Sequence, residues 1–195
     1  MNHLLSSALL LTALLLGAPS YAQTAGPAAS GETAETGSTL DQLFGDLKRE
    51  RNERAAERIA QKIWAEWFKS GSASIDLMMS WSQDAIKEKK YGVALDFLDQ
   101  IVTLQPQFAE GWNRRATLHF MMNEYDKSLA DIRRTLALEP RHFGALSGWG
   151  MILKNTGQKA QALKVFMQAL EFYPMMRNAQ SEVAELTDEL AGDDI

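Results

Sequence analysis

Three prolines recur at a fixed interval, and this period constrains the fold more than any other feature of the sequence. Pro106, Pro140 and Pro174 lie 34 residues apart, and each follows a similar amphipathic phrase. A proline after such a run ends a helix, because it has no N–H to donate and restricts the backbone of the residue before it. The chain therefore repeats one helical unit three times, with predicted bounds 75–108, 109–142 and 143–176.

Each unit contains two amphipathic patterns separated by a short polar turn, which predicts a pair of antiparallel helices. Small residues recur where the two helices must approach closely, and large apolar residues recur beside them. One such pair cannot bury its own apolar faces, so neighbouring units are expected to stack around a continuous core. The small residues are Ser82, Ala116, Gly150, Ala94, Ser128 and Ala162, and the large ones are Trp81, Trp112, Trp149, Leu98, Ile132 and Phe166.

The pattern resembles the tetratricopeptide repeat family, whose units share the order Trp, Leu-Gly, Tyr, Ala, Phe, Ala and Pro. The resemblance covers residues 75–176, about half of the chain. It implies an all-α fold, namely a right-handed superhelix of three helix-turn-helix repeats. The matching residues are Trp81, Ser82, Tyr91, Ala94, Leu98 and Pro106 in the first unit, Trp112, Ala116, Ile132 and Pro140 in the second, and Trp149, Gly150, Gly157, Ala162, Phe166, Ala169 and Pro174 in the third.

In the family that these units resemble, the first helices line a concave surface that holds extended peptides or helices. The corresponding surface here has an apolar centre and polar edges, and methionine side chains adapt to irregular apolar partners. Two alternatives stay open: the methionines fill the core, or the N-terminal helix covers the groove. The predicted peptide groove consists of Asp76, Met79, Gln83, Ile86, Glu110, Asn113, Thr117, Phe120, Met121, Ser147, Met151, Lys154 and Asn155.

Some relatives grip a C-terminal carboxylate with a set of Lys, Asn and Arg side chains. The places that correspond to this clamp in the present sequence hold mostly other residues, so a C-terminal carboxylate is not the expected ligand. They hold Met79, Gln83, Arg114, Gly144 and Gly148.

Arg115 departs from the family pattern, which usually has an inward-facing leucine at this place. An unpaired charge inside the packing of a hairpin is costly. We therefore expect Arg115 to pair with a carboxylate such as Asp99 or Asp131, or with helix-end carbonyls. A structural ion pair and a ligand-binding arginine both fit this pattern.

Amphipathic segments flank the repeats on both sides. Residues 39–70 are predicted to form one long helix, with an apolar stripe from Leu40 to Leu47, a charged centre, and a second stripe from Ile59 to Phe68. The second stripe is expected to pack on the first unit as a cap, which leaves the first stripe to fold back or to meet another chain. Residues 177–191 are predicted to form a C-terminal capping helix, followed by an acidic tail over 192–195.

The first 22 residues are typical of a secretory signal peptide. The run from Leu4 to Leu16 is almost continuously apolar, and Ser20 and Ala22 supply the small residues that a signal peptidase reads. The run is shorter than the about 20 residues that a membrane span needs. We therefore expect a cleaved signal over 1–22, a flexible linker over 23–38, no integral span in the mature chain, and a location in the periplasm of a Gram-negative bacterium.

Motifs that carry chemistry are sparse in this sequence. The chain contains no cysteine, which excludes disulfides and cysteine-based zinc sites. His119 and His142 are not part of any metal or catalytic motif, and no glycine-rich phosphate loop occurs. The formal charge of -5 argues against nucleic acid as a partner. The sequence predicts no enzyme activity, no metal and no cofactor.

The first hypothesis for function is protein–protein interaction, as an adaptor or assembly scaffold of the bacterial cell envelope that binds another protein or peptide. The first alternative is a structural protein that self-associates through residues 40–69. The second alternative, an enzyme with an unrecognised site, has no motif to support it.

Overall fold

The computed structural model describes residues 30–192, with side chains from residue 39 onward. This part of the chain is entirely helical, with no strand. The signal peptide expected over 1–22 lies outside the described residues, as do residues 193–195 of the acidic tail. The helices are α1 (Ser30–Arg49), α2 (Glu53–Trp67), α3 (Ala73–Lys87), α4 (Tyr91–Leu104), α5 (Ala109–Met121), α6 (Tyr125–Leu138), α7 (Phe143–Asn155), α8 (Lys159–Phe172) and α9 (Arg177–Gly192).

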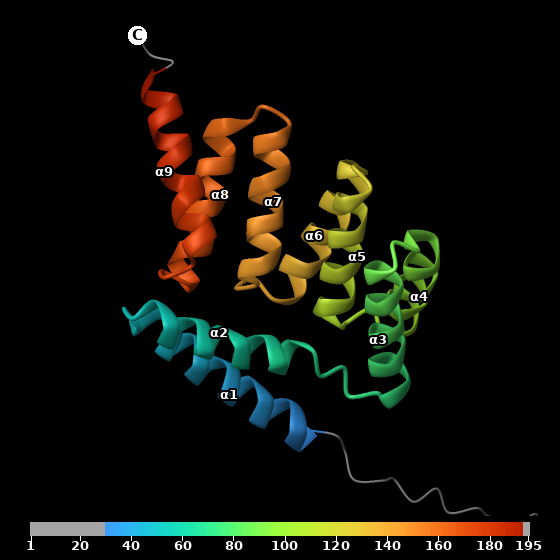
Figure 1. Cartoon of the computed structure of the whole chain (residues 1–195). Helices are drawn as coiled ribbons and strands as arrows, with labels where there is room; N and C mark the ends of the chain where they lie inside the picture. Colours follow the sequence, from blue (N-terminus) through green and yellow to red (C-terminus); the bar gives the residue numbers. More distant parts are fainter. Residues whose placement is uncertain (1–29, 193–195) are drawn as a thin grey trace, which may run out of the picture.

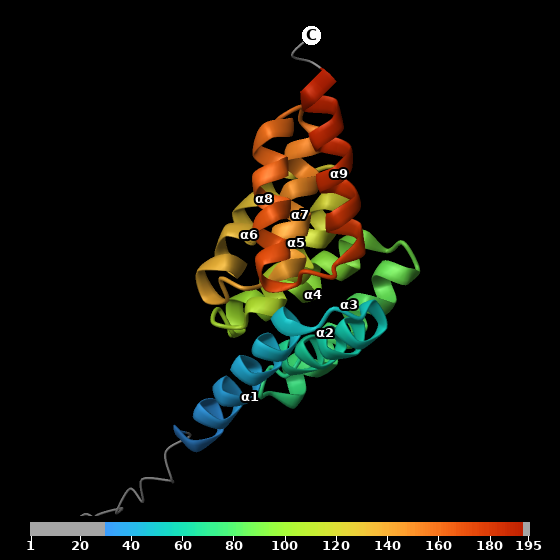
Figure 2. The same cartoon turned by 90° about the vertical axis from the view of Figure 1, so that its left-hand side faces the viewer.

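Three helical hairpins stand side by side, and they correspond to the three predicted units (Figure 1). The pairs are α3 with α4, α5 with α6, and α7 with α8. The helix α9 packs against α8 and closes one end of the stack (Figures 1 and 2). Among the described helices, none has both the length and the apolar character that crossing a bilayer requires.

The turn inside each hairpin repeats with the same backbone geometry. Lys89, Asn123 and Gly157 are 34 residues apart, and all three have a positive φ, of 58°, 60° and 78° respectively. In each turn the next residue donates its N–H to a carbonyl five residues back, as Lys90 does to Ala85 at 2.8 Å. This is the closure that ends a helix at a left-handed residue. Only the third turn uses glycine, the residue that adopts this conformation without strain.

The small residues of the repeat pattern allow close helix packing, as the sequence predicts. A methyl group placed on Gly150 would lie 2.7 Å from the ring of Phe166, so only glycine fits there. In the second hairpin, Ser128 is buried and donates its hydroxyl hydrogen to the carbonyl of Ala116 at 2.8 Å. Small residues thus let the two helices approach closely in the second and third hairpins.

The expectation of one long helix over 39–70 is wrong. The chain leaves helical geometry after Arg49 and begins α2 at Glu53. Asn52 caps α2 by accepting the N–H of Ala55 at 3.0 Å, and the Glu50 carboxylate accepts the N–H groups of Arg51 and Asn52. These side chains satisfy the backbone groups that a continuous helix would have paired. The linker expected over 23–38 is wrong for residues 30–38, which belong to α1, and residues 23–29 lie outside the described residues.

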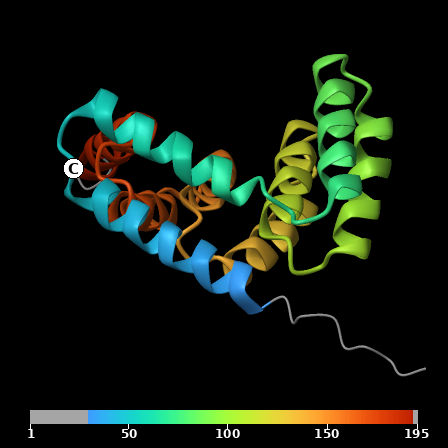
Figure 3. The ribbon, with the colours of Figure 1, turned by 90° about the horizontal axis from the view of Figure 1, so that it is seen from below.

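As a result, α1 and α2 form an antiparallel pair that lies across the ends of α7, α8 and α9 (Figure 3). We call this pair the N-terminal strap. Its two apolar stripes bury together against the third repeat, so the first stripe folds back within the chain. The shared core consists of Phe44, Leu47, Ala56, Ala60, Ile63, Trp67, Phe143 and Tyr173, with Leu40, Leu43, Ile59, Trp64, Phe172, Met175 and Met176 packed around it.

The second stripe was expected to pack on the first repeat, and this is wrong for all of its apolar residues except Phe68. The physical reason lies in the third repeat, which places Phe143 and Tyr173 where the second repeat has Ala109 and Glu139. Phe143 is 2% exposed. Its ring packs on Trp64 and Trp67 with centroid distances of 5.5 and 4.9 Å. An aromatic end on one repeat thus attracts the aromatic residues of the strap.

Ion pairs at two positions join the edge of the strap to the repeats and to α9. Arg141 reaches Asp41 of α1 at 2.6 Å, and Arg177 reaches Glu53 of α2 at 2.8 Å. The Arg141 guanidinium also lies 4.3 Å over the ring of Phe44. The hydrogen bond that the Arg141 guanidinium donates to Glu139, with a second to Asp41, raises the pKa of Arg141 above its ordinary value. The exposed pairs add orientation more than stability, because surface ion pairs contribute little.

Candidate peptide-binding groove

Two hollows lie on the side of the stack formed by the first helix of each hairpin. The first hollow lies between α5 and α7, with α6 as its floor. It is lined by Asn113, Ala116, Thr117 and Phe120 of α5, Ser128 and Ile132 of α6, and Gly144, Ala145 and Gly148 of α7. We call it the central hollow.

Two glycines keep the central hollow open. Gly144 and Gly148 are one turn apart on α7, so the methyl group of Ala145 is all that α7 adds to the wall opposite Thr117 and Phe120. A methyl group on Gly148 would find only Ile132 within contact, at 3.7 Å. The hollow holds ≈ 90 Å³, which is well below the about 300–1,000 Å³ of small-molecule sites. Its size suits one apolar side chain of a longer ligand.

The second hollow lies where the strap joins the first repeat. Phe68, which follows α2, lines it together with residues of α3 and with Arg114 of α5. The guanidinium of Arg114 stacks 4.6 Å above the Phe68 ring and reaches Glu110 at 2.8 Å. One clamp position therefore keeps a cation, which is already engaged by a carboxylate. The lining residues are Phe68, Asp76, Met79, Ser80, Gln83 and Arg114.

Six of the thirteen predicted groove residues line these two hollows: Asp76, Met79, Gln83, Asn113, Thr117 and Phe120. The other seven lie elsewhere. Ile86 and Met151 pack against core clusters, and Met121 is 42% exposed. Ser147 is buried and contacts Asn178, and Asn155 donates to the Tyr125 hydroxyl at 3.3 Å. The observed wall of the groove is thus shorter than the wall that the repeat phase predicts.

Lys154 is drawn away from the groove by the C-terminal helix. Its ammonium group contacts Glu182 at 2.7 Å and Glu185 at 2.9 Å, both on α9. The hydrogen bond to Glu182, with a second to Glu185, raises the pKa of Lys154. The acidic face of α9 therefore has a cationic partner in α7 at this place, which sequence spacing does not reveal.

Glu110 is a groove residue in the sequence interpretation, but the structure buries it in a polar cluster. Its side chain is fully covered and accepts hydrogen bonds from Asn113 at 2.9 Å and Arg114 at 2.8 Å. His142, also fully buried, lies 3.1 Å away through Nε2. The Nδ1 atom of His142 accepts the N–H of Ala145 at 3.1 Å, which assigns the ring hydrogen to Nε2 and makes His142 a donor to Glu110.

This cluster also joins the strap to the repeats. The indole of Trp67 stacks on the His142 ring with a centroid distance of 4.0 Å and an interplanar angle of 8°. Gly144 lies beside it, and a methyl group there would be 2.6 Å from the ring of Trp64. The strap therefore covers the N-terminal end of α7, at His142 and Gly144, and leaves the central hollow open. The sequence signal that could have found this contact is the Arg141–Gly144 phrase at the junction of the second and third units, which differs from the phrases at the equivalent positions 73–76 and 107–110.

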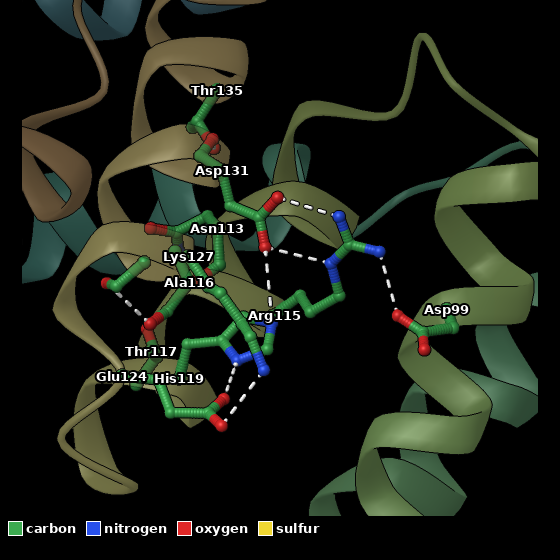
Figure 4. A network of polar contacts seen from close by, with 11 residues as sticks. Asp99, Asn113, Arg115, Ala116, Thr117, His119, Glu124, Lys127, Asp131 and Thr135 are labelled. Atoms are coloured by element: carbon green, nitrogen blue, oxygen red, sulfur yellow. Dashed lines mark hydrogen bonds and ion pairs between the residues drawn. The ribbon is translucent and has the colours of Figure 1, made fainter.

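Arg115 forms the ion pairs that the sequence predicts, with both named carboxylates (Figure 4). Its guanidinium donates to both oxygens of Asp131 at 2.7 and 2.8 Å, and to Asp99 of the preceding repeat at 2.8 Å. The hydrogen bonds that Arg115 donates to Asp131 raise the pKa of Arg115 above its ordinary value. Because these carboxylates lie on α4 and α6, Arg115 faces away from the two hollows and bridges two repeats.

His119 and Glu124 extend the same network. Nδ1 of His119 lies 2.7 Å from the Glu124 carboxylate, which also contacts Lys127 at 2.9 Å. Hydrogen bonds from Lys127 and His119 lower the pKa of Glu124. Through this contact the buried His119 of α5 is bound to Glu124 at the start of α6, so it helps to hold the two helices together. Within the described residues, no three His, Asp or Glu side chains gather as a metal site would require.

Comparisons with known proteins agree with this architecture. The family model described as "Tetratricopeptide repeat" matches residues 149–174. A TPR repeat-containing protein of Rhizobium etli is 52% identical over 153 residues, which cover 78% of this chain and 75% of that protein. Among solved structures, the first TPR of Spaghetti (RPAP3) bound to the HSP90 peptide SRMEEVD is similar, with a TM-score of 0.57, 20% identity, and coverage of 60% of this chain and 93% of that one.

A crystal structure of the MamA protein matches a larger share of the chain. Its TM-score is 0.55 at 15% identity, and the match covers 80% of this chain and 82% of that one. At such identities the likeness concerns the fold alone. The Rhizobium etli protein, at 52% identity over most of its length, carries the family assignment. The chain belongs to the tetratricopeptide repeat family.

Proposed function

We propose that the chain binds a segment of another protein on the concave side of its repeats, with one apolar side chain of that segment in the central hollow. The observation that carries the proposal is the bare wall formed by Gly144 and Gly148 opposite Thr117 and Phe120. A hollow of this size, lined mainly by apolar atoms, favours a single anchor residue of a longer ligand.

The ligand class follows from what surrounds the hollow. The related domain of Spaghetti is bound to a peptide that ends in EEVD. In the present chain the only cation among the clamp positions, Arg114, is paired with Glu110. An anionic C-terminus would have to compete with that buried carboxylate. We therefore propose an internal, apolar-anchored segment as the ligand, and a binding role without catalysis.

The proposal includes an adaptor or assembly role in the bacterial cell envelope. Its support is the apolar run Leu4–Leu16 followed by the small residues Ser20 and Ala22, which together are typical of an export signal. Mass spectrometry of the protein recovered from the envelope fraction of its host tests this part. A mature N-terminus at Gln23 is expected, and a full-length chain in the cytosolic fraction would contradict it.

The binding site is tested by photocrosslinking in the native envelope with a crosslinker at Thr117, which is exposed at the mouth of the hollow. A specific protein adduct is expected from Thr117 and not from Met167, an exposed apolar position on α8. The variant Gly148→Leu fills the hollow and should abolish the adduct. Its matched control Gly148→Ala leaves most of the hollow open and should retain it.

Circular dichroism and urea unfolding of both glycine variants verify that each one folds. The site is wrong if Gly148→Leu, correctly folded, gives the same adduct in the same yield as the wild type. It is also wrong if the Thr117 and Met167 positions give the same set of adducts.

A further inference from the structure

The first repeat presents an apolar face that nothing in the described chain covers. Four of the six exposed large hydrophobic residues belong to this hairpin: Leu77, Trp81, Val93 and Leu104, which are between 47% and 67% exposed. Trp81 packs against Phe97 of α4, with ring centroids 5.5 Å apart. Leu77 lies one turn from Trp81 on α3, and Val93, Phe97 and Leu104 share one phase of α4. We call these five residues the end face.

The residues at equivalent positions of the other repeats indicate the role of the end face. In the second and third repeats, the residues equivalent to Leu77 are Gly111 and Ala145, and both are buried against the preceding hairpin. The first repeat has no preceding hairpin. The N-terminal strap, which could have covered it, is held by the third repeat instead (Figure 3). The α3 part of the end face is therefore a stacking surface without a neighbour, and Val93, Phe97 and Leu104 of α4 extend its apolar area.

One position distinguishes this face from an ordinary repeat junction. Leu118 and Ile152 are at most 1% exposed and pack against the previous hairpin, whereas the equivalent residue of the first repeat is Asp84, which is exposed. A permanent cover from the same chain would bury that carboxylate at a cost. An apolar centre with charges at its edge is typical of a surface that pairs with a separate molecule.

Exposed ion pairs at the rim suit a second copy of this chain as that molecule. Asp84 pairs with Lys87 at 2.9 Å on α3, and Glu88, just after α3, pairs with Lys90, just before α4, at 2.6 Å. Asp84, Glu88 and Lys90 line one shallow hollow with Trp81, Val93 and Phe97. A twofold axis parallel to the hairpin would place α3 of one copy against α4 of the other. Trp81 would then meet Phe97, and Asp84 and Glu88 of each copy would lie beside Lys90 of the other, so the exposed pairs can exchange partners across the axis.

The opposite end of the stack is a poor match for the end face. There α9 presents an acidic outer side with Glu182, Glu185, Asp188 and Glu189, and no lysine or arginine follows Arg177. Head-to-tail stacking would place these acids against leucine and tryptophan, at a desolvation cost. The Leu40–Leu47 stripe, the other candidate for self-association, is buried in the strap core.

We infer that the end face of α3 and α4 is the dimerisation surface of this protein, with two copies paired about a twofold axis through their first repeats. The central hollow is on a different side of the stack, between α5 and α7. Dimerisation in this way leaves the central hollow of each copy accessible. On the proposed function, the dimer would then bind two ligand segments at once.

Sedimentation equilibrium of the full chain over a wide concentration range tests the inference. The wild type should approach twice the protomer mass as concentration rises. The double variant Leu77→Gln, Trp81→Gln should weaken self-association by about tenfold or more, because it removes the apolar centre of the interface. Met167→Gln, at a side chain 53% exposed on α8, is the matched control and should leave the dimer unchanged.

A charge exchange tests the geometry of the pair. Lys90→Glu should weaken the dimer, and the combination of Lys90→Glu with Asp84→Lys and Glu88→Lys should restore it, because the opposite signs again face each other across the axis. Urea unfolding verifies that each variant is folded. A monomer at every concentration, a dimer unaffected by the double variant, or the surface capturing a different protein in place of its own copy would each overturn the inference.

The dimer and the peptide site can fail separately. Gly148→Leu should leave the sedimentation of the protein unchanged, and the double variant should leave the Thr117 adduct in place.

Discussion

The third and first repeats carry the same motif, yet the chain treats their outer surfaces in opposite ways. The third repeat ends in Phe143 and Tyr173, and the N-terminal strap buries both. The first repeat has Ile75 and Gln105 at those places, and its apolar side chains gather on the end face, where they stay exposed. The difference teaches that the repeat period fixes how hairpins stack, while a few side chains outside the motif decide where the flanking helices dock.

The largest expected effect concerns the aromatic end of the third repeat. Phe143→Ala removes a ring that packs on Trp64, Trp67 and Tyr173, so it should lower the free energy of unfolding by about 4 kcal/mol. Leu104→Ala, on the first repeat at 67% exposure, should change it by less than about 0.5 kcal/mol. Urea denaturation monitored by circular dichroism measures both. Equal effects would show that the two ends are not treated differently.

The second effect compares two equivalent carboxylates. Glu110→Ala leaves His142 and Arg114 without their buried acceptor, so it should destabilise the protein by about 3 kcal/mol. Asp76 occupies the same repeat position in α3, is exposed, and accepts hydrogen bonds from Ser70. Asp76→Ala should cost only about 1 kcal/mol. Thermal unfolding of the two variants side by side measures both losses of stability. A larger loss from Asp76→Ala than from Glu110→Ala would contradict the buried cluster.

The third effect separates two glycines of one helix. Gly144→Ala would bring its methyl group to 2.6 Å from Trp64, so the strap must shift; we expect a loss of about 2 kcal/mol. Gly148→Ala has room for the methyl group and removes a flexible residue from a helix, so it should gain about 0.5–1 kcal/mol. A Trp-fluorescence change that accompanies Gly144→Ala alone would place the disturbance at the strap. A gain in stability from Gly144→Ala, or a loss from Gly148→Ala, would contradict the packing described.

The smallest effect lies in the hairpin turns. Lys89→Gly should stabilise the first repeat by about 1 kcal/mol, because the left-handed φ of 58° strains a residue with a side chain. Asn123→Gly should gain less, since asparagine adopts this conformation more readily. Lys89→Ala removes the charge but keeps the strain, so it serves as the control. A comparable gain from Lys89→Ala would trace the effect to charge and not to the backbone.

Sequence reasoning predicts the repeats well because helix, turn and hairpin depend on residues that are close along the chain. The prolines, the small residues and the polar turns recur in phase, and the hairpins form where they indicate. Arg115 could be paired with Asp99 and Asp131 in advance, because all three positions are fixed by the repeat. The break at residues 50–52 was missed, since a charge-rich segment suits a helix as well as a capped turn.

The groove was predicted only in part, because partners that the repeat motif does not specify redirect its residues. Lys154 pairs with α9, and Glu110 turns inward to His142. Repeat phase alone assigns both side chains to the groove wall. The partner of Lys154 lies 28 residues away on a helix outside the repeats, and the partner of Glu110 lies 32 residues away at a turn position where the motif does not call for histidine.

The amino-acid sequence by itself determined that this chain is a stack of three helical hairpins, because a period of proline, small and large residues leaves no other way to bury the apolar faces. Tertiary structure alone decided that the N-terminal helices cross the third repeat and leave the first one bare. The reason is that docking depends on the fit between distant surfaces, here Trp64 over Gly144 and Trp67 on His142. No local pattern specifies such a fit.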